Sequence, residues 1–183
     1  MRRRLQHWVR QLPDLSFYPE SVLVSQALAD PVTFGSAHRQ DIAHLADIAD
    51  LAFIAFADAE PALRSALVSA NAWERYWSLI ACSCFGQAAV SLADEARVLL
   101  SDTEPLVRVR AAEFLAILGL GDPQATLVDV LNSTGSVAEA LVTLNTVVFV
   151  NDCLDVERIR ADDLKLQVTD SELDRRLAYL ADG

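Results

Sequence analysis

The sequence predicts an all-α protein, an α-solenoid in which antiparallel helix pairs stack side by side with a period of about 33 residues. The period comes from a match between two stretches, "ERYWSLIACSCFG" at 74–86 and "VRVRAAEFLAILG" at 107–119. They share an arginine, small and apolar residues at helical spacing, and a final glycine. Apolar residues recur at helical spacing in most other segments, whereas alternating strand patterns are nearly absent. Each pair would be apolar on a face that only its neighbour can cover, which favours a stacked array.

The match also extends backwards along the chain. One period upstream lies "IAHLADIADLA" at 42–52, and the second helices match as well, "ALRSALVSA" (62–70) with "EARVLLSDT" (95–103). The unit is therefore a helix pair with a short turn, repeated about three times. After Gly119 the register is looser.

Helix starts are predicted where an acidic residue precedes a proline, at Asp30-Pro31, Glu60-Pro61, Glu104-Pro105 and Asp122-Pro123. The acidic residue can cap the helix and complement its dipole, while proline suits the first turn. Thr169 and Glu172 have the spacing of a capping box that opens the last helix. An irregular stretch, "LPDLSFYPE", follows the first helix. The expected helices cover 2–11, 20–29, 38–57, 61–69, 72–85, 88–100, 105–118, 123–131, 137–149 and 170–181.

No Gly/Ser-rich linker divides the chain, so we expect one array with atypical ends. Residues 1–36 form an amino-terminal helical and irregular segment that packs on the array. Residues 37–150 form the repeats. Residues 151–183 form an acidic connector and a capping helix.

Charge excludes some partners. The chain of 183 residues carries a net charge of −11 and a single lysine, Lys165. Binding to a phosphate backbone needs clustered Lys and Arg, and the one dense cluster is Arg2-Arg3-Arg4 near the start. We therefore expect no nucleic-acid partner.

The sequence gives little indication of a membrane-spanning segment, a signal peptide or a cysteine-based site. The most apolar stretch, "LAFIAFA" at 51–57, is too short to cross a bilayer, and the start lacks the apolar run of a signal peptide. The default expectation is a cytoplasmic chain without a membrane partner. Cys82, Cys84 and Cys153 lack zinc-ligand spacing, and we interpret them as small buried side chains.

The stretch "SDTEPLVRVRAAEFLAILG" at 101–119 resembles a HEAT repeat, in which an Asp precedes a proline-initiated helix carrying Val-Arg and Ala-Ala. The resemblance implies an armadillo-type fold with a ladder of Asp–Arg hydrogen bonds between neighbouring repeats. Here the implied ladder residues are Arg75, Asp102 and Arg108. The ladder is partial, because Ser69 and Asn71 stand where the first repeat would carry its Asp. The residues that match the repeat are Asp102, Pro105, Val107, Arg108, Ala111, Ala112 and Leu115.

A narrower resemblance covers most of the chain. "HWVRQLPDLSFYPES" (7–21), "RYWSLIACSCFG" (75–86) and "LVTLNTVVFV" (141–150) are similar to the helical, HEAT-like tail of certain bacterial sulfatases. The most specific parts are "D-L-x-F-x-P-E" at 14–20 and "R-Y-W" at 75–77. The resemblance implies a non-catalytic carboxy-terminal region that packs on a sulfatase catalytic domain.

The chain itself carries no catalytic motif. A sulfatase needs Cys or Ser in C-x-[P/A]-x-R for formylglycine, with calcium ligands, and none of the three cysteines has that context. No P-loop, G-x-G-x-x-G or G-x-S-x-G occurs. We expect no cofactor and no catalytic residue here, so any sulfatase active site would lie outside this sequence.

Two polar groups could be read as sites, but we interpret both as solvated surface. His38, Asp41, His44 and Asp47 recur at steps of three, which drift around a helix, so that at most two neighbours could share a metal ion. We therefore expect no metal site. The second group lies in the acidic connector and consists of Arg158, Arg160, Asp162 and Asp163.

Three aromatic residues, Trp73, Tyr76 and Trp77, are a candidate protein interface. Trp77 aligns with Arg110 of the next repeat, a position expected to be exposed, and exposed aromatics are typical of interfaces. In the alternative, the amino-terminal segment with Phe17 and Tyr18 folds back over these rings.

The predicted function is a non-catalytic structural and protein-interaction module, most specifically the carboxy-terminal region of a sulfatase. The alternative is a free-standing HEAT-repeat adaptor that binds another protein. A bilin lyase or a HEAT-like DNA-repair enzyme fits less well, because the second needs a basic groove. The mean hydropathy of +0.24 is high, so the isolated chain is expected to self-associate through an uncovered apolar face.

Overall fold

The computed structural model describes residues 8 and 11–182, and every regular element within them is helical. No strand occurs among these residues, so the prediction of an all-α protein is confirmed. The expected helix at 2–11 lies almost entirely outside the described residues. The α-helices are α2 (Glu20–Val22), α3 (Pro31–Ala37), α4 (Arg39–Asp50), α5 (Phe56–Leu67), α6 (Ala72–Phe85), α7 (Ala93–Leu99), α8 (Pro105–Ile117), α9 (Gln124–Ser133), α10 (Val137–Cys153) and α11 (Ser171–Asp182).

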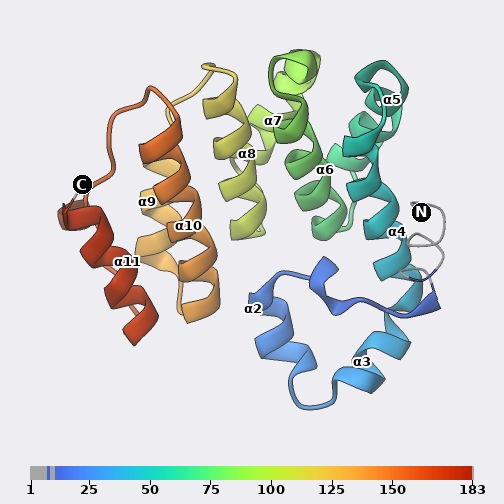
Figure 1. Ribbon diagram of the computed structural model, residues 1–183, viewed down its shortest axis with the longest axis horizontal. Helices are drawn as coiled ribbons and strands as arrows, with labels where there is room; N and C mark the ends of the chain where they lie inside the picture. Colours follow the sequence, from blue (N-terminus) through green and yellow to red (C-terminus); the bar gives the residue numbers. More distant parts are fainter. Residues whose placement is uncertain (1–7, 9–10, 183) are drawn as a thin grey trace.

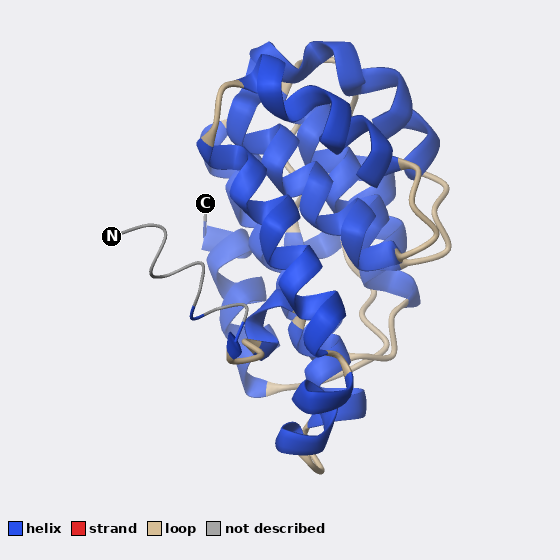
Figure 2. Cartoon of the chain, turned by 90° about the vertical axis from the view of Figure 1, so that its right-hand side faces the viewer, coloured by secondary structure: helices blue, strands red, loops and turns tan. Residues whose placement is uncertain are grey.

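Four of these helices stand side by side in one row. Helix α6 packs between α4 and α8, and α8 packs between α6 and α10. Helix α5 packs on α4 and α6, α7 packs on α8, and α9 packs on α8 and α10, so that these helices form a second set against the row. Figure 2 shows the helices from the side. Helix α11 packs on α10 and ends the row.

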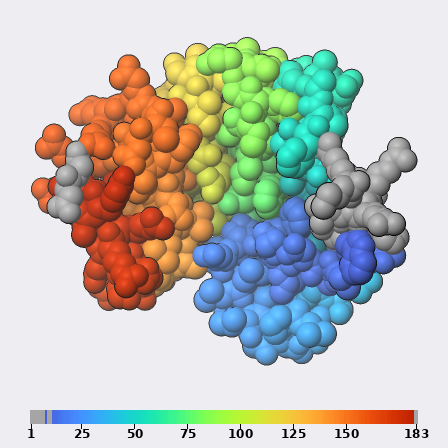
Figure 3. All heavy atoms as spheres, viewed as in Figure 1, coloured from blue at the N-terminus to red at the C-terminus, as the bar shows by residue number. Residues whose placement is uncertain are grey.

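The amino-terminal segment closes the lower side of this row. It contains a 3₁₀ turn (Leu15–Phe17), α2, a π-helical turn (Leu23–Ala27) and α3. The 3₁₀ turn contacts α4, and α2 contacts α10 at the other end of the row. In the space-filling view the segment, in blue, fills the space below the helices between α10 and α4 (Figure 3).

Three apolar clusters hold the elements together. The largest lies between α5, α6, α7 and α8 and contains the fully buried Leu63, Leu79 and Phe114. The second joins α9, α10 and α11. The third joins the amino-terminal segment to α4 through Tyr18, Ile42 and their neighbours, with Trp73 and Trp77 of α6 packed against it. Burial of apolar area at these three places is the main force that favours the fold.

The structure corrects two expected boundaries in the first repeat. The predicted helix 38–57 ends at Asp50, and the chain turns through a 3₁₀ turn (Leu51–Phe53) before α5 begins at Phe56. Pro61 does not begin a helix but lies inside α5. The prediction was wrong because Leu51–Ala55 contains only good helix formers and apolar residues. Tertiary packing of Leu51, Ala52 and Phe56 against the large cluster decides the break instead.

The predicted start at Asp30-Pro31 is confirmed, since Asp30 caps the helix through a 3.0 Å hydrogen bond from the Thr33 N–H. The helix that begins there, α3, is absent from the expected helix ranges. Two other starts differ from the expectation. The expected helix 88–100 begins as a 3₁₀ turn (Gly86–Leu92) and becomes α-helical at Ala93. At the last helix, Asp170 accepts from the Glu172 N–H at 2.8 Å, so the cap is not the expected Thr169 capping box.

The final glycine of the repeat has a conformational role. Gly86 and Gly119 follow α6 and α8 with φ of 54° and 67°, values that L-residues with a side chain rarely adopt. The ends of α6 and α8 therefore share a backbone requirement for glycine.

One apolar helical run, Ala72–Leu99, is long enough by length and composition to cross a membrane. It consists of α6, the 3₁₀ turn and α7, and the chain changes direction at Gly86. Leu79, Cys82 and Leu92 of this run are fully buried in the largest cluster. The run is therefore a pair of core helices, not a single straight one.

Candidate functional site

The structure brings together two of the three predicted ladder residues. Arg75 of α6 donates from Nε to Asp102 Oδ2 at 2.6 Å and from Nη2 to Asp102 Oδ1 at 2.7 Å. Its Nη1 also donates to the Ser69 carbonyl at 2.8 Å. The carboxylate of Asp102 is only 5% exposed, so this bidentate pair joins the α5–α6 turn to the loop before α8 in a largely dry environment.

Burial raises the pKa of Asp102, but the hydrogen bonds from Arg75 and the Glu104 N–H outweigh it. The charges of Arg75 and Arg108 act in the same direction as these hydrogen bonds, so the pKa of Asp102 lies below its ordinary value.

Arg108 is placed differently. Its Nη2 lies 3.8 Å from Asp129 Oδ2 of α9, and its Nε is buried without a hydrogen-bond partner among the described residues. Arg108 therefore affects Asp102 through its charge, and its closest ion pair is with the following helix pair.

The three candidate interface residues contact the chain's own amino-terminal segment. Tyr76 is buried, and Trp73 and Trp77 are half-buried. The Phe17 ring lies 5.4 Å from that of Trp77, and the Trp77 Nε1–H donates to the Phe17 carbonyl at 2.7 Å. The Tyr18 ring meets Trp73 edge to face at 6.4 Å. The alternative in which this segment folds back over the rings is thus the arrangement found.

A polar cluster that the sequence did not reveal lies beside these rings. Arg110, expected to be exposed, keeps only 18% of its side-chain surface and pairs with Glu113 one turn later. It also donates to the Tyr76 hydroxyl at 3.3 Å, and Thr146 of α10 donates to Glu113 at 3.0 Å. These contacts link α8 to α6 and to α10. The positive charge of Arg110 and the negative charge of Glu113 compensate each other where they are buried.

Arg110 and Glu113 also line a shallow pocket of about 210 Å³ with Asn145, Thr146 and Phe149. The spacing of Glu113 and Thr146 is one period, 33 residues. A pair of polar residues one repeat apart is the signal by which a sequence could reveal this cluster.

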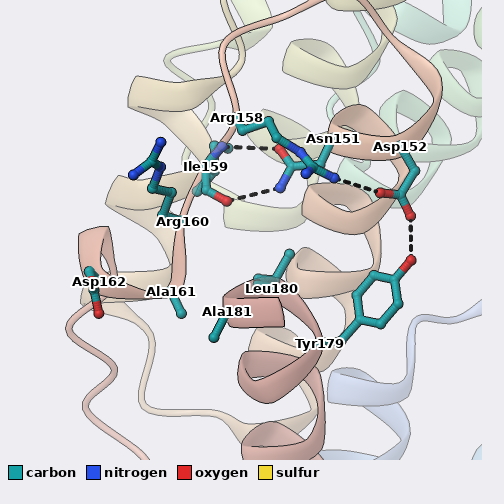
Figure 4. A pocket seen from close by; sticks show the side chains of 10 residues that line it. All are labelled: Asn151, Asp152, Arg158, Ile159, Arg160, Ala161, Asp162, Tyr179, Leu180 and Ala181. Carbon is teal, nitrogen blue, oxygen red and sulfur yellow. Dashed lines mark hydrogen bonds and ion pairs between the residues drawn. The ribbon is translucent and has the colours of Figure 1, made fainter. Parts of the chain in front are cut away.

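A second pocket, of about 260 Å³, lies between the acidic connector and α11 (Figure 4). Asp152 accepts from the Tyr179 hydroxyl at 2.8 Å and from Arg158 at 3.3 Å. The Asn151 amide exchanges two hydrogen bonds with the Ile159 main chain, at 2.9 and 3.0 Å, which orders the connector. Arg158, one of the connector residues expected to be solvated surface, is thus held in an ion pair at the wall of this pocket. Arg160 and Asp162 line the same pocket.

The histidines of α4 do not converge on a site. His38 stacks on Phe34 with ring centroids 4.1 Å apart, whereas His44 lies 3.5 Å from Glu74 of α6. Within residues 8 and 11–182, no group of three His, Cys, Asp or Glu side chains is placed to hold a metal ion.

The cysteine prediction was correct for one residue of three. Cys82 is buried, and burial, with a smaller contribution from Cys84, raises the pKa of the Cys82 thiol to about 12. Cys84 and Cys153 are exposed, so the interpretation as buried side chains was wrong for both.

Comparison with known proteins does not assign the chain to a family. No family model, no curated protein and no solved structure matches the chain.

Proposed function

We propose that the chain is a HEAT-like α-solenoid that acts as a non-catalytic structural and protein-interaction module. The observation that carries the proposal is the buried, bidentate Arg75–Asp102 pair, which joins one helix pair to the next where a HEAT ladder would lie. The row of α4, α6, α8 and α10 with α5, α7 and α9 packed against it supports the same proposal.

The partner within this proposal is the catalytic domain of a sulfatase-type hydrolase, of which the chain is the carboxy-terminal region. One contact supports it beyond the sequence resemblance. The two most specific resemblance segments, 14–20 and 75–77, lie against each other through Phe17 and Trp77. Two segments that resemble the same family and contact each other are expected to belong to the same structural unit.

A free-standing adaptor is the second candidate, and a different observation favours it. The α10 end of the row is covered by α11, where Leu173 and Leu180 are buried, and the amino-terminal segment covers the lower side from α4 to α10. Covered ends are typical of repeat arrays that stand alone in solution.

The two candidates differ in the size of the native polypeptide. An antibody to residues 151–183 would detect a band well above 20.0 kDa if the chain is the tail of a larger enzyme. Formylglycine would then be sought by mass spectrometry in the upstream part. A band at 20.0 kDa would contradict the sulfatase proposal and favour the adaptor.

The interaction role has its own test in the native-length protein. Val32 on α3 and Val98 on α7 are exposed to similar degrees, 79% and 74%. In Figure 1, α3 lies below the row of helices and α7 lies in its upper part. Val32→Asp and Val98→Asp are therefore matched surface changes. Loss of co-purifying partner or of activity with one change and not the other, at equal helix content by circular dichroism, would locate the docking side. No effect from either would contradict docking through these two faces.

A further inference from the structure

A single residue connects the amino-terminal segment to the row of helices. His38 is the C-cap of α3 and the N-cap of α4, with φ −102° and ψ 15°, while the residues on both sides are helical. The two helices meet there at an angle (Figure 1). The whole segment before His38 is therefore joined to the row through one non-helical residue.

The segment is held by elements that lie beyond this joint. The Phe17 carbonyl accepts from Trp77, and Tyr18 packs on Trp73, both on α6. Tyr18 and Val22 share an apolar cluster with Ile42 and Leu45 of α4, whose side chains are fully buried. A surface complementary to the segment thus exists on every copy of the chain.

Nothing in the sequence prevents α3 and α4 from becoming one helix. Pro31 stands in the first turn, where proline is tolerated, and Asp30 already caps that end. No further proline occurs before Asp50, and the Ile42 N–H already donates to the His38 carbonyl at 2.9 Å. A continuous helix over 31–50 would direct the segment away from its own α6 while its internal contact between Tyr18 and Phe34 stays intact.

We propose that two copies of this chain exchange their amino-terminal segments, so that residues 11–37 of each pack on α4, α6 and α10 of the other. The partner that covers this surface is a second copy of the chain. Its amino-terminal segment is identical in sequence, so it has the same shape and the same hydrogen-bond donors and acceptors as the segment that covers the surface within one chain. Exchange of an identical element is a low-cost route to a dimer, since each interaction that opens within one chain forms again between the two chains. The inference is independent of the proposed function.

A pair of substitutions at the hinge tests the exchange. His38→Ala and His38→Gly both remove the stacking on Phe34 and the 2.8 Å contact of Nδ1 with the Phe34 carbonyl. They differ in helix propensity by about fivefold in an equilibrium constant, in favour of alanine. With two hinges per dimer, the dissociation constant of the His38→Ala dimer should be roughly 25-fold lower than that of the His38→Gly dimer.

Sedimentation velocity of full-length wild type and both variants, equilibrated over a wide concentration range, measures this ratio. The expected result is a dimer in which alanine promotes and glycine suppresses association. Monomers throughout, or dimers of equal affinity in both variants, would overturn the proposal, the second because it would place the association on another surface.

An isotope-filtered NOE experiment on an equilibrated mixture of labelled and unlabelled wild-type chains supplies an independent readout. Exchange predicts intermolecular NOEs between the Trp77 indole of one copy and the Phe17 ring of the other. A dimer without these NOEs would also refute exchange.

Discussion

The indole N–H of Trp77 donates a hydrogen bond of 2.7 Å to the main-chain carbonyl of Phe17, a residue 60 positions earlier. The hydrogen bond holds the backbone of the amino-terminal segment, and the 5.4 Å ring contact holds the Phe17 side chain. One tryptophan therefore fixes both the position and the register of the segment on α6.

Replacing Trp77 by Phe should lower the free energy of unfolding by about 1–2 kcal/mol, because the ring stays apolar but the Phe17 carbonyl loses its donor. Urea unfolding followed by circular dichroism measures the loss. Trp73→Phe is the matched control, since Trp73 is a half-buried tryptophan of the same helix with no hydrogen bond from its indole to a described residue. An equal loss in both variants would mean that ring size, not the hydrogen bond, holds the segment.

Removing the carboxylate of Asp102 should be among the most destabilising single changes in the chain. Asp102→Ala leaves Arg75, only 12% exposed, with an uncompensated charge, and the expected cost is about 3–5 kcal/mol. Asp94→Ala removes the partner of Arg97, but Asp94 is 92% exposed, so that loss should stay below about 0.5 kcal/mol. Chemical denaturation of both variants makes the comparison, and a small effect at Asp102 would argue against a ladder role.

Glu104 should make stability depend on pH in the direction opposite to that of Asp102. Burial, with the nearby charges of Glu139 and Asp102, raises the pKa of Glu104 above its ordinary value near 4.5. The folded state then binds the proton more tightly than the unfolded state, so this group lowers stability as pH rises through the raised pKa. Glu104→Gln should therefore be more stable than wild type at pH 7, with a difference that shrinks as the pH falls through the raised pKa and is largely gone below 4.5.

Unfolding curves of wild type and Glu104→Gln between pH 4 and 8 test this expectation. A stability difference that is constant across that range would show that ionisation of Glu104 is not its cause.

The turn after α6 should tolerate only glycine. Gly86 has space for a methyl group, since no atom lies within 4 Å of the place that a Cβ would take, but its φ of 54° strains any other residue. Gly86→Ala should cost about 1–3 kcal/mol. Gly135→Ala, which also meets no atom but lacks a positive φ, should be neutral or stabilise by up to about 1 kcal/mol. Thermal unfolding of the two variants separates conformational strain from packing.

The helical class and most helix positions could be predicted because they depend on local signals. Pro105 begins α8 as expected, and the glycines that end α6 and α8 fall at equal places of the repeat. Pro61 misled because it lies in the second turn of α5, where a proline is normally unfavourable since its missing N–H removes one helical hydrogen bond. Burial of Ala59, Leu63 and Leu67 of α5 in the largest apolar cluster outweighs that cost.

The polar cluster is not evident from any single helix, because it depends on contacts between helices. Arg110 looks like a surface residue when α8 is considered alone, and its contacts with Tyr76 on α6, Thr146 on α10 and Glu113 make its burial acceptable. Likewise, the aromatic residues of α6 left two alternatives open, and only the path of residues 15–18 decides between them.

The contact between α2 and α10 affects how the chain folds while the ribosome synthesises it. Helices that touch mainly their neighbours in the sequence can form one after another as they emerge. The amino-terminal segment is made before α4–α10, yet its contact on α10 does not exist until α10 has been synthesised. Its apolar residues therefore stay partly uncovered through most of translation, which makes this segment the natural point of action for a chaperone.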